Sequence, residues 1–115
     1  MLIDETTLKT LPPLYEQEDS DDPTIYAKLA TPGDAWACYI AEYGKKNGED
    51  VIFGLFVSKK WGYNWAQISL AEIERDLRGA NLEARLAPNF TRASASSLTT
   101  IRRRIQHVTR ELHAM

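Results

Sequence analysis

The chain has 115 residues, of which 43% are apolar and 26% are charged. These values are typical of a folded globular protein and exclude a wholly disordered chain, and the length suits a single domain, residues 1–115, with one core. The net charge of −2 argues against a dedicated nucleic-acid binder.

The charge is distributed unevenly along the chain. Residues 1–57 contain eleven acidic and four basic side chains, whereas residues 58–115 contain five acidic and ten basic ones. This asymmetry predicts either two faces of opposite potential or a pairing of the two halves within the fold. The sequence leaves both interpretations open.

The N-terminal residues lack the basic and apolar segments of a signal peptide, and no apolar run approaches the roughly 20 residues that span a bilayer. We therefore expect a cytoplasmic protein with no membrane partner. The single cysteine, Cys38, rules out an internal disulfide and lies in an apolar run, so we expect a buried thiol.

The first half of the chain predicts one short helix, an acidic loop and three strands. Asp4 suits the N-cap of a helix that ends before Pro12-Pro13. Residues 16–23 contain five carboxylates and should form a solvated loop. The predicted strands are 24–29, 36–43 and 51–57, separated by turns at 31–34 and 44–48.

Alternation within these strands assigns their faces. Trp36, Cys38 and Ile40 should share one face of the sheet, and Ala37, Tyr39 and Ala41 should share the other. The strand 51–57 is almost continuously apolar, so we expect it to be covered on both faces. Gly54 within it predicts a β-bulge or a close approach by another element.

The second half predicts a turn over 59–64, a strand over 65–68, two helices, and either an edge strand or an extended segment over 82–86. The first helix, 69–78, begins with the capping box of Ser69 and Glu72. The second is a basic amphipathic helix over about 96–113. Its apolar residues recur in steps of three and four and are Leu98, Ile101, Ile105, Val108 and Leu112.

Strands followed by helices predict an α+β fold. We expect a four-stranded, mostly antiparallel sheet, a short N-terminal helix, and two C-terminal helices packed on one face. The apolar stripe of the last helix suits either the core of a monomer or the seam of a homodimer.

Several motifs resemble a known bacterial family. They are Leu11-Pro12-Pro13-Leu14-Tyr15, Ile25-Tyr26-Ala27-Lys28, Thr31-Pro32, Trp36 with Tyr39 and Glu42, Phe53-Gly54-Leu55-Phe56-Val57, and Ile68-Ser69-Leu70-Ala71-Glu72-Ile73. In this order, over about residues 8–98, the chain resembles the family called domain of unknown function 2958. The resemblance implies an origin on plasmids, phages or other mobile elements, and it implies no particular reaction.

No motif for catalysis, a cofactor or a metal is visible, so we expect a protein that is not an enzyme and holds neither cofactor nor metal. His107 and His113 lie six residues apart and so on different faces of a helix. A Cys38–His107 pair would join a buried thiol to a surface helix. Glu72 and Asp76 share a helix face with arginines nearby, which favours a solvated surface over a catalytic pair. The acidic loop lacks the glycine and bidentate Glu of a calcium loop.

Two surfaces are predicted to bind partners. The first combines the acidic loop with a turn of cations and aromatics and consists of Glu16, Glu18, Asp19, Asp21, Asp22, Lys59, Lys60, Trp61 and Tyr63. The second is basic and consists of Arg92, Arg102, Arg103, Arg104 and Arg110. The first suits a protein partner, and the second suits phosphate contacts with a nucleic acid.

These features predict a non-catalytic protein-binding module from a mobile genetic element. Its partner would be a host protein or nucleoprotein complex, such as a CRISPR or restriction system that it inhibits or modulates. The acidic loop would imitate the charge of DNA phosphates. The alternative is an accessory protein that binds nucleic acid through the basic helix.

Overall fold

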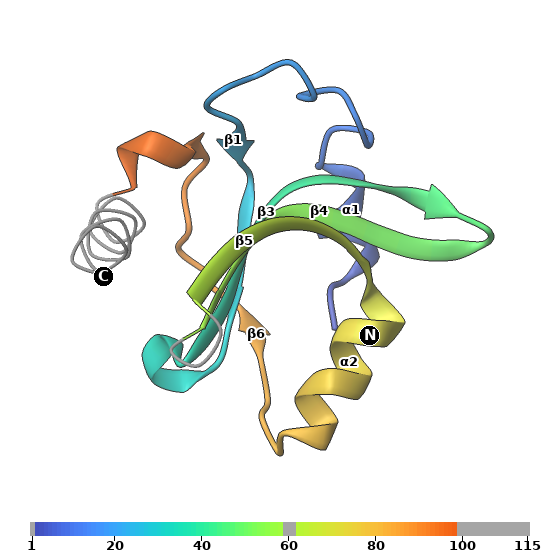
Figure 1. Ribbon diagram of the computed structural model, residues 1–115, viewed down its shortest axis with the longest axis vertical. Coiled ribbons are helices and arrows are strands. Elements are labelled where there is room, and N and C mark those ends of the chain that lie inside the picture. Colours follow the sequence, from blue (N-terminus) through green and yellow to red (C-terminus); the bar gives the residue numbers. More distant parts are fainter. Residues whose placement is uncertain (1, 59–61, 99–115) are drawn as a thin grey trace, which may run out of the picture.

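The computed structural model describes residues 2–58 and 62–98, and of residue 63 the backbone alone. At its centre lies an antiparallel sheet of five strands in the order β5-β4-β3-β2-β6 (Figure 1). These strands are β2 (Ala27–Ala30), β3 (Trp36–Lys46), β4 (Glu49–Ser58), β5 (Gly62–Ser69) and β6 (Arg85–Leu86). The other elements are the paired strands β1 (Thr24–Ile25) and β7 (Ala93–Ser94), the helices α1 (Glu5–Lys9) and α2 (Leu70–Gly79), and 3₁₀ turns at Pro32–Asp34 and Ala95–Ser97.

The α+β class is confirmed, but the predicted count of four strands is wrong. The main sheet has five strands, and a separate sheet of two strands accompanies it. The predicted strand 24–29 is divided at Tyr26, because β1 pairs with β7 whereas β2 pairs with β3 and β6. The last predicted strand, 65–68, begins earlier, at Gly62.

The final predicted helix lies almost entirely outside the described residues. At its expected start, the 3₁₀ turn Ala95–Ser97 is followed by Leu98, whose backbone is extended (φ −81°, ψ 105°). Residues 95–98 are therefore not part of an α-helix. The packing or dimerisation of its apolar stripe beyond Leu98 stays a prediction.

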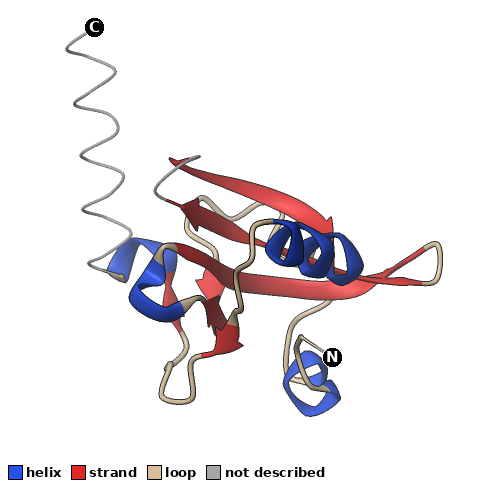
Figure 2. Ribbon diagram, turned by 90° about the horizontal axis from the view of Figure 1, so that it is seen from below, coloured by secondary structure: helices blue, strands red, loops and turns tan. Residues whose placement is uncertain are grey.

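Strands β3 and β4 form a long hairpin that projects beyond the rest of the sheet (Figures 1 and 2). Its turn consists of Asn47 (φ 54°) and Gly48 (φ 80°), between the paired residues Lys46 and Glu49. Two consecutive positive φ angles are the requirement of the tight turn whose twist matches a hairpin, and Asn-Gly meets it at low cost. The predicted hairpin is confirmed, but its turn is shorter than the predicted 44–48, because Gly44, Lys45 and Lys46 pair with β4 as part of β3.

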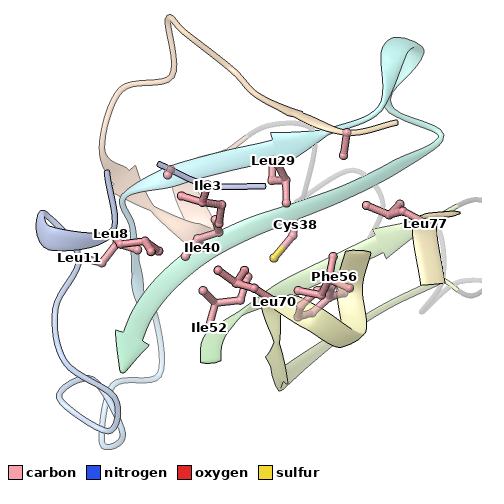
Figure 3. Close-up of a cluster of buried hydrophobic side chains, with 13 residues drawn as sticks. Ile3, Leu8, Leu11, Leu29, Cys38, Ile40, Ile52, Phe56, Leu70 and Leu77 are labelled. Carbon is pink, nitrogen blue, oxygen red and sulfur yellow. The ribbon is translucent and has the colours of Figure 1, made fainter. Parts of the chain in front are cut away.

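Both described α-helices pack on one face of the sheet, and the second of the two C-terminal helices predicted for that face lies outside the described residues. Asp4 caps α1 by accepting a hydrogen bond from the Thr7 N–H (3.3 Å), and Ser69 caps α2 by accepting from the Glu72 N–H (3.1 Å). Their apolar residues meet those of the strands around the buried thiol of Cys38 (Figure 3). The buried residues of this first face are Ile3, Leu8, Leu11, Ala27, Leu29, Cys38, Ile40, Ile52, Phe56, Leu70, Ile73, Leu77 and Ala84.

Among the described residues, the second face of the sheet is covered by the segment 90–98, which contains no α-helix. The ring of Phe90 packs edge-on against Tyr39 at 6.4 Å between centroids, and Ala95 and Leu98 join the same cluster. The buried residues here are Ile25, Ala37, Tyr39, Ala41, Leu55, Val57 and Ala95. Strand β4 is thus covered on both faces, as its apolar sequence predicted.

A β-bulge interrupts the pairing of β3 with β4. Ile40 pairs with Gly54 and Glu42 pairs with Phe53, so Ala41 is an extra residue on β3. A Cβ atom on Gly54 would collide with the carbonyl oxygen of Tyr39 and lie 3.2 Å from the Cys38 sulfur. Gly54 therefore marks both a bulge and a close approach of the neighbouring backbone, the two alternatives that the sequence left open.

We expect Gly54→Ala to destabilise the protein by about 2–3 kcal/mol, because the added methyl group must displace backbone atoms in a packed sheet. Urea denaturation followed by circular dichroism measures the change. Gly79→Ala is the matched control, since a Cβ atom there meets no atom within 4 Å, and it should leave the stability unchanged or slightly higher. Equal stabilities for the two variants would contradict the close approach at Gly54.

Candidate functional site

The bulge in β3 decides which way Glu42 points. Simple alternation would place Glu42 on the first face with Cys38 and Ile40, in the apolar core. The extra residue Ala41 moves Glu42 to the second face, opposite Phe53. Bulges commonly redirect a side chain in this way.

Glu42 is buried, with 2% of its surface exposed, and its carboxylate holds the start of the acidic loop. Oε1 accepts a hydrogen bond from the N–H of Tyr15 (2.8 Å), and Oε2 accepts one from the N–H of Gln17 (2.6 Å). Tyr15 has a positive φ of 73°, a conformation that costs energy for a bulky residue and persists only where its surroundings impose it. No lysine or arginine in the described part of the chain forms an ion pair with Glu42.

The side chain of Gln17 joins the loop to β1 and β3. Its Nε2 donates to the carbonyl oxygens of Thr24 (3.0 Å) and Ala41 (3.2 Å), and its Oε1 accepts from the N–H of Thr24 (2.6 Å). All the hydrogen-bonding groups of this amide except one acceptor site are used. The acidic loop is therefore attached to the sheet at two adjacent positions, Glu42 and Gln17.

The five loop carboxylates are exposed, as predicted, and differ in their contacts. Asp22 accepts hydrogen bonds from the N–H (2.8 Å) and the hydroxyl group (2.5 Å) of Ser96, which anchors the far end of the loop. Glu18 and Asp21 form no hydrogen bond or ion pair through their carboxylates within residues 2–58 and 62–98. The loop that arches from α1 to β1 in Figure 1 is thus fixed at both ends.

Between the acidic loop and the sheet lies an open hollow of about 440 Å³. Its floor is a row of side chains on three adjacent strands, because Glu42 on β3 pairs with Phe53 on β4, and Phe53 pairs with Gln67 on β5. Its lining residues are Tyr15, Gln17, Glu18, Ser20, Asp21, Pro23, Glu42, Phe53, Trp65 and Gln67. We call this feature the loop–sheet hollow.

Aromatic rings form one side of the loop–sheet hollow. Trp65 stacks on Phe53 with 5.4 Å between ring centroids and an interplanar angle of 21°, yet 39% of Trp65 is exposed. Tyr15 is 51% exposed. Exposed aromatics beside a hollow are typical of contact surfaces, because their rigid rings bury a large area on binding.

A lysine of the protein already contacts one of these rings. The Lys46 ammonium lies 4.9 Å from the centre of the Tyr15 ring and donates to Gln67 Oε1 at 2.7 Å. Its proximity lowers the pKa of the Tyr15 hydroxyl group, because the ammonium stabilises the phenolate. This rim therefore binds a cation by an aromatic face and an amide oxygen together.

Other groups that the sequence raised for chemistry are placed unfavourably for it. Cys38 is fully buried and burial raises the pKa of its thiol, so the reactive thiolate is disfavoured. Glu72 and Asp76 are exposed on α2. Within residues 2–58 and 62–98 no three His, Cys, Asp or Glu side chains are grouped to hold a metal ion, and no helix has the length and apolar character to cross a membrane.

The structure tests the predicted surfaces only in part. Of the basic surface, Arg92 is described and its guanidinium lies 5.4 Å from the centre of the Tyr26 ring. Arg102, Arg103, Arg104, Arg110 and both histidines lie outside the described residues, as do Lys59, Lys60, Trp61 and the side chain of Tyr63. The acidic residues Glu16, Glu18, Asp19, Asp21 and Asp22 all lie on the loop described above.

Sequence reasoning missed the residues that position the loop. Glu42 was noted only within the family resemblance, and Gln17 and Gln67 were not selected. One signal was available, since Glu42 interrupts an apolar strand and charged residues are almost never buried without partners. The sequence did not show that its partners are backbone N–H groups of the loop.

Glu42→Gln tests the anchoring of the loop. The amide offers one acceptor where two N–H groups are bound, so one N–H of Tyr15 or Gln17 is left facing an NH₂ group, at a cost of about 1–3 kcal/mol. We expect lower stability in urea and faster hydrogen exchange at both amides. Glu18→Gln, on the exposed part of the loop, should change neither quantity. Unaltered exchange in Glu42→Gln would show that the loop is held by other contacts.

The pKa values of two tyrosines, Tyr15 and Tyr43, should be shifted in opposite directions from the ordinary value for tyrosine. The Tyr43 hydroxyl group donates to Asp50 (2.5 Å), which raises the pKa of Tyr43 to about 12, whereas that of Tyr15 is lowered. The contribution of Tyr43 to stability is therefore full below about pH 10 and lost as the pH rises through 12. In an ultraviolet titration of tyrosinate, Tyr43→Phe should remove a component near pH 12, and Tyr15→Phe should remove one below the ordinary value for tyrosine; the reverse assignment would contradict both contacts.

Comparison of the chain with known protein families, with curated proteins and with solved structures finds no match. The resemblance to the domain of unknown function 2958 family accordingly stays a prediction. The function is argued below from the acidic loop and the loop–sheet hollow.

Proposed function

We propose that this protein is a non-catalytic protein-binding module, and that its contact surface is the acidic loop together with the aromatic residues of the loop–sheet hollow. The observation that carries the proposal is the attachment of the loop by Glu42, Gln17 and Asp22. A loop held in one conformation loses little conformational entropy when a partner binds, so its contacts contribute more fully to affinity.

The charge of this surface defines the kind of partner. Glu16, Glu18, Asp19 and Asp21 are exposed and close in sequence, and Lys46 is the cation found at the rim of the hollow. A surface of this sign attracts a basic surface, accelerates their encounter and excludes acidic partners. The proposed partner is therefore a protein with a basic patch.

A more specific proposal concerns the identity of the partner and the biological role of the module. The partner would be a host protein or nucleoprotein complex, and the module would inhibit or modulate a host defence system of the CRISPR or restriction type on behalf of a mobile genetic element. Exposed carboxylates on an ordered loop present negative charge as DNA phosphates do, and so suit a basic site that normally receives DNA. The resemblance described from the sequence supports this origin.

Affinity capture from a bacterial extract tests the proposal. Neutralising four loop residues (Glu16→Gln, Glu18→Gln, Asp19→Asn and Asp21→Asn) should reduce partner capture at least tenfold, because complementary charge contributes over 1.4 kcal/mol in total. Capture by the unmodified protein should also fall as salt rises. Mass spectrometry quantifies both effects.

A matched control changes the net charge equally at exposed residues elsewhere, namely Glu49→Gln, Glu72→Gln, Asp76→Asn and Glu83→Gln. It should leave capture within about twofold. Equal losses in the two quadruple variants would show that net charge alone matters and would overturn the assignment of the surface. Retention of an oligonucleotide at low salt by the unmodified protein, lost on Arg102→Ala, would instead favour the nucleic-acid alternative.

A further inference from the structure

We infer that the loop–sheet hollow is a receptor for one arginine side chain of a basic partner segment, with the guanidinium stacked on Trp65 and paired with Glu18 and Asp21. This inference rests on the proposed function and specifies the chemistry that its surface recognises. Three separate features of the hollow lead to it: its charge, its exposed aromatic face and its open volume.

Three carboxylates line the hollow, and no lysine or arginine of the described residues lies among its lining side chains. Glu42 lies at its floor, 2% exposed, and its two hydrogen-bond donors are neutral backbone N–H groups. Backbone donors stabilise a carboxylate without cancelling its charge, and the field of a buried charge is screened less than that of an exposed one. Glu18 and Asp21 add two carboxylates at the edge. The electrostatic potential in the hollow is therefore negative and favours the binding of a cation.

The aromatic side favours a planar cation. Trp65 stacks on Phe53 through one face and keeps 39% of its surface exposed beside the hollow. A guanidinium group stacks on an indole face and at the same time donates N–H groups in its own plane to carboxylates. An ammonium group of lysine presents no plane to stack, so arginine fits the combination of ring and carboxylates better.

The protein itself contains an example of this contact at the neighbouring ring. Lys46 places its ammonium 4.9 Å from the centre of the Tyr15 ring and donates to Gln67. Tyr15 and Gln67 are also lining residues of the hollow. Thus the same rim already holds one cation, and Trp65 is a second exposed ring in a hollow of about 440 Å³ that Glu18 and Asp21 also line.

Peptide binding followed by nuclear magnetic resonance tests the inference. The probe is a capped peptide of glycine and serine with two central arginines, and the comparison peptides carry citrulline or lysine at the same places. Citrulline has the shape of arginine without its charge. We expect the arginine peptide to shift the Trp65 indole N–H signal and the Gln17 amide signal, with an affinity about tenfold above citrulline and several-fold above lysine.

Two pairs of variants separate the hollow from the loop in general. Glu18→Gln with Asp21→Asn should weaken the arginine peptide about tenfold, whereas Glu16→Gln with Asp19→Asn, on the same loop outside the hollow, should weaken it less than twofold. Trp65→Ala should weaken it similarly to the first pair, and circular dichroism verifies its fold. All four carboxylates are exposed, so both double variants are expected to fold.

The outcomes distinguish this inference from the proposed function. Equal binding of arginine and citrulline, or equal losses in the two double variants, would overturn the arginine receptor, while loss of partner capture in the quadruple loop variant would still support a protein-binding module. The chemical shift of the Trp65 indole N–H should not depend on protein concentration when no peptide is present. A change with concentration would assign the hollow to a second copy of this chain, and this would also overturn the inference.

Discussion

The buried carboxylate of Glu42 is the interaction on which the arrangement of the acidic loop depends. Removal of an ionised group from water costs several kcal/mol, and here the compensation comes from two backbone N–H groups of the loop. The β-bulge at Ala41 brings the carboxylate to the face where those donors lie. The bulge and the loop conformation therefore require each other, since either one alone would leave a buried charge without partners.

The elements that the sequence predicted correctly depend on residues close together in the chain. The caps at Asp4 and Ser69, the Asn47-Gly48 turn and the alternation from Trp36 to Ala41 each involve a few neighbouring positions. The division of the strand 24–29 and the pairing of β1 with β7 depend instead on contacts between residues about 70 positions apart. No local propensity encodes such contacts. The fifth strand of the main sheet, β6, lies within the segment 82–86 that the sequence predicts as an edge strand or an extended segment, and its pairing with β2 again joins residues far apart in the chain.

Only the acidic half of the candidate site could be predicted, because the other half also depends on contacts between residues distant in the chain. Its acidic side is visible as a run of carboxylates in the sequence, and that loop is exposed as expected. Its other side is a row across three strands, and the row exists only because the bulge shifts the register by one residue between Ile40 and Glu42. In the sequence Phe53 looks like an ordinary strand residue, because its meeting with the loop follows from this register and not from its neighbours in sequence.

The hydrogen bonds between Asp22 and Ser96 join positions 74 residues apart. During synthesis, Ser96 emerges from the ribosome only after every strand of the sheet has been made. The far end of the loop consequently lacks this anchor while the nascent chain is shorter than this, although Glu42 and Gln17 are available much earlier. The negatively charged surface is thus complete only after all the strands have been synthesised, and an incomplete chain ending before Ser96 lacks one of the three attachments of the loop.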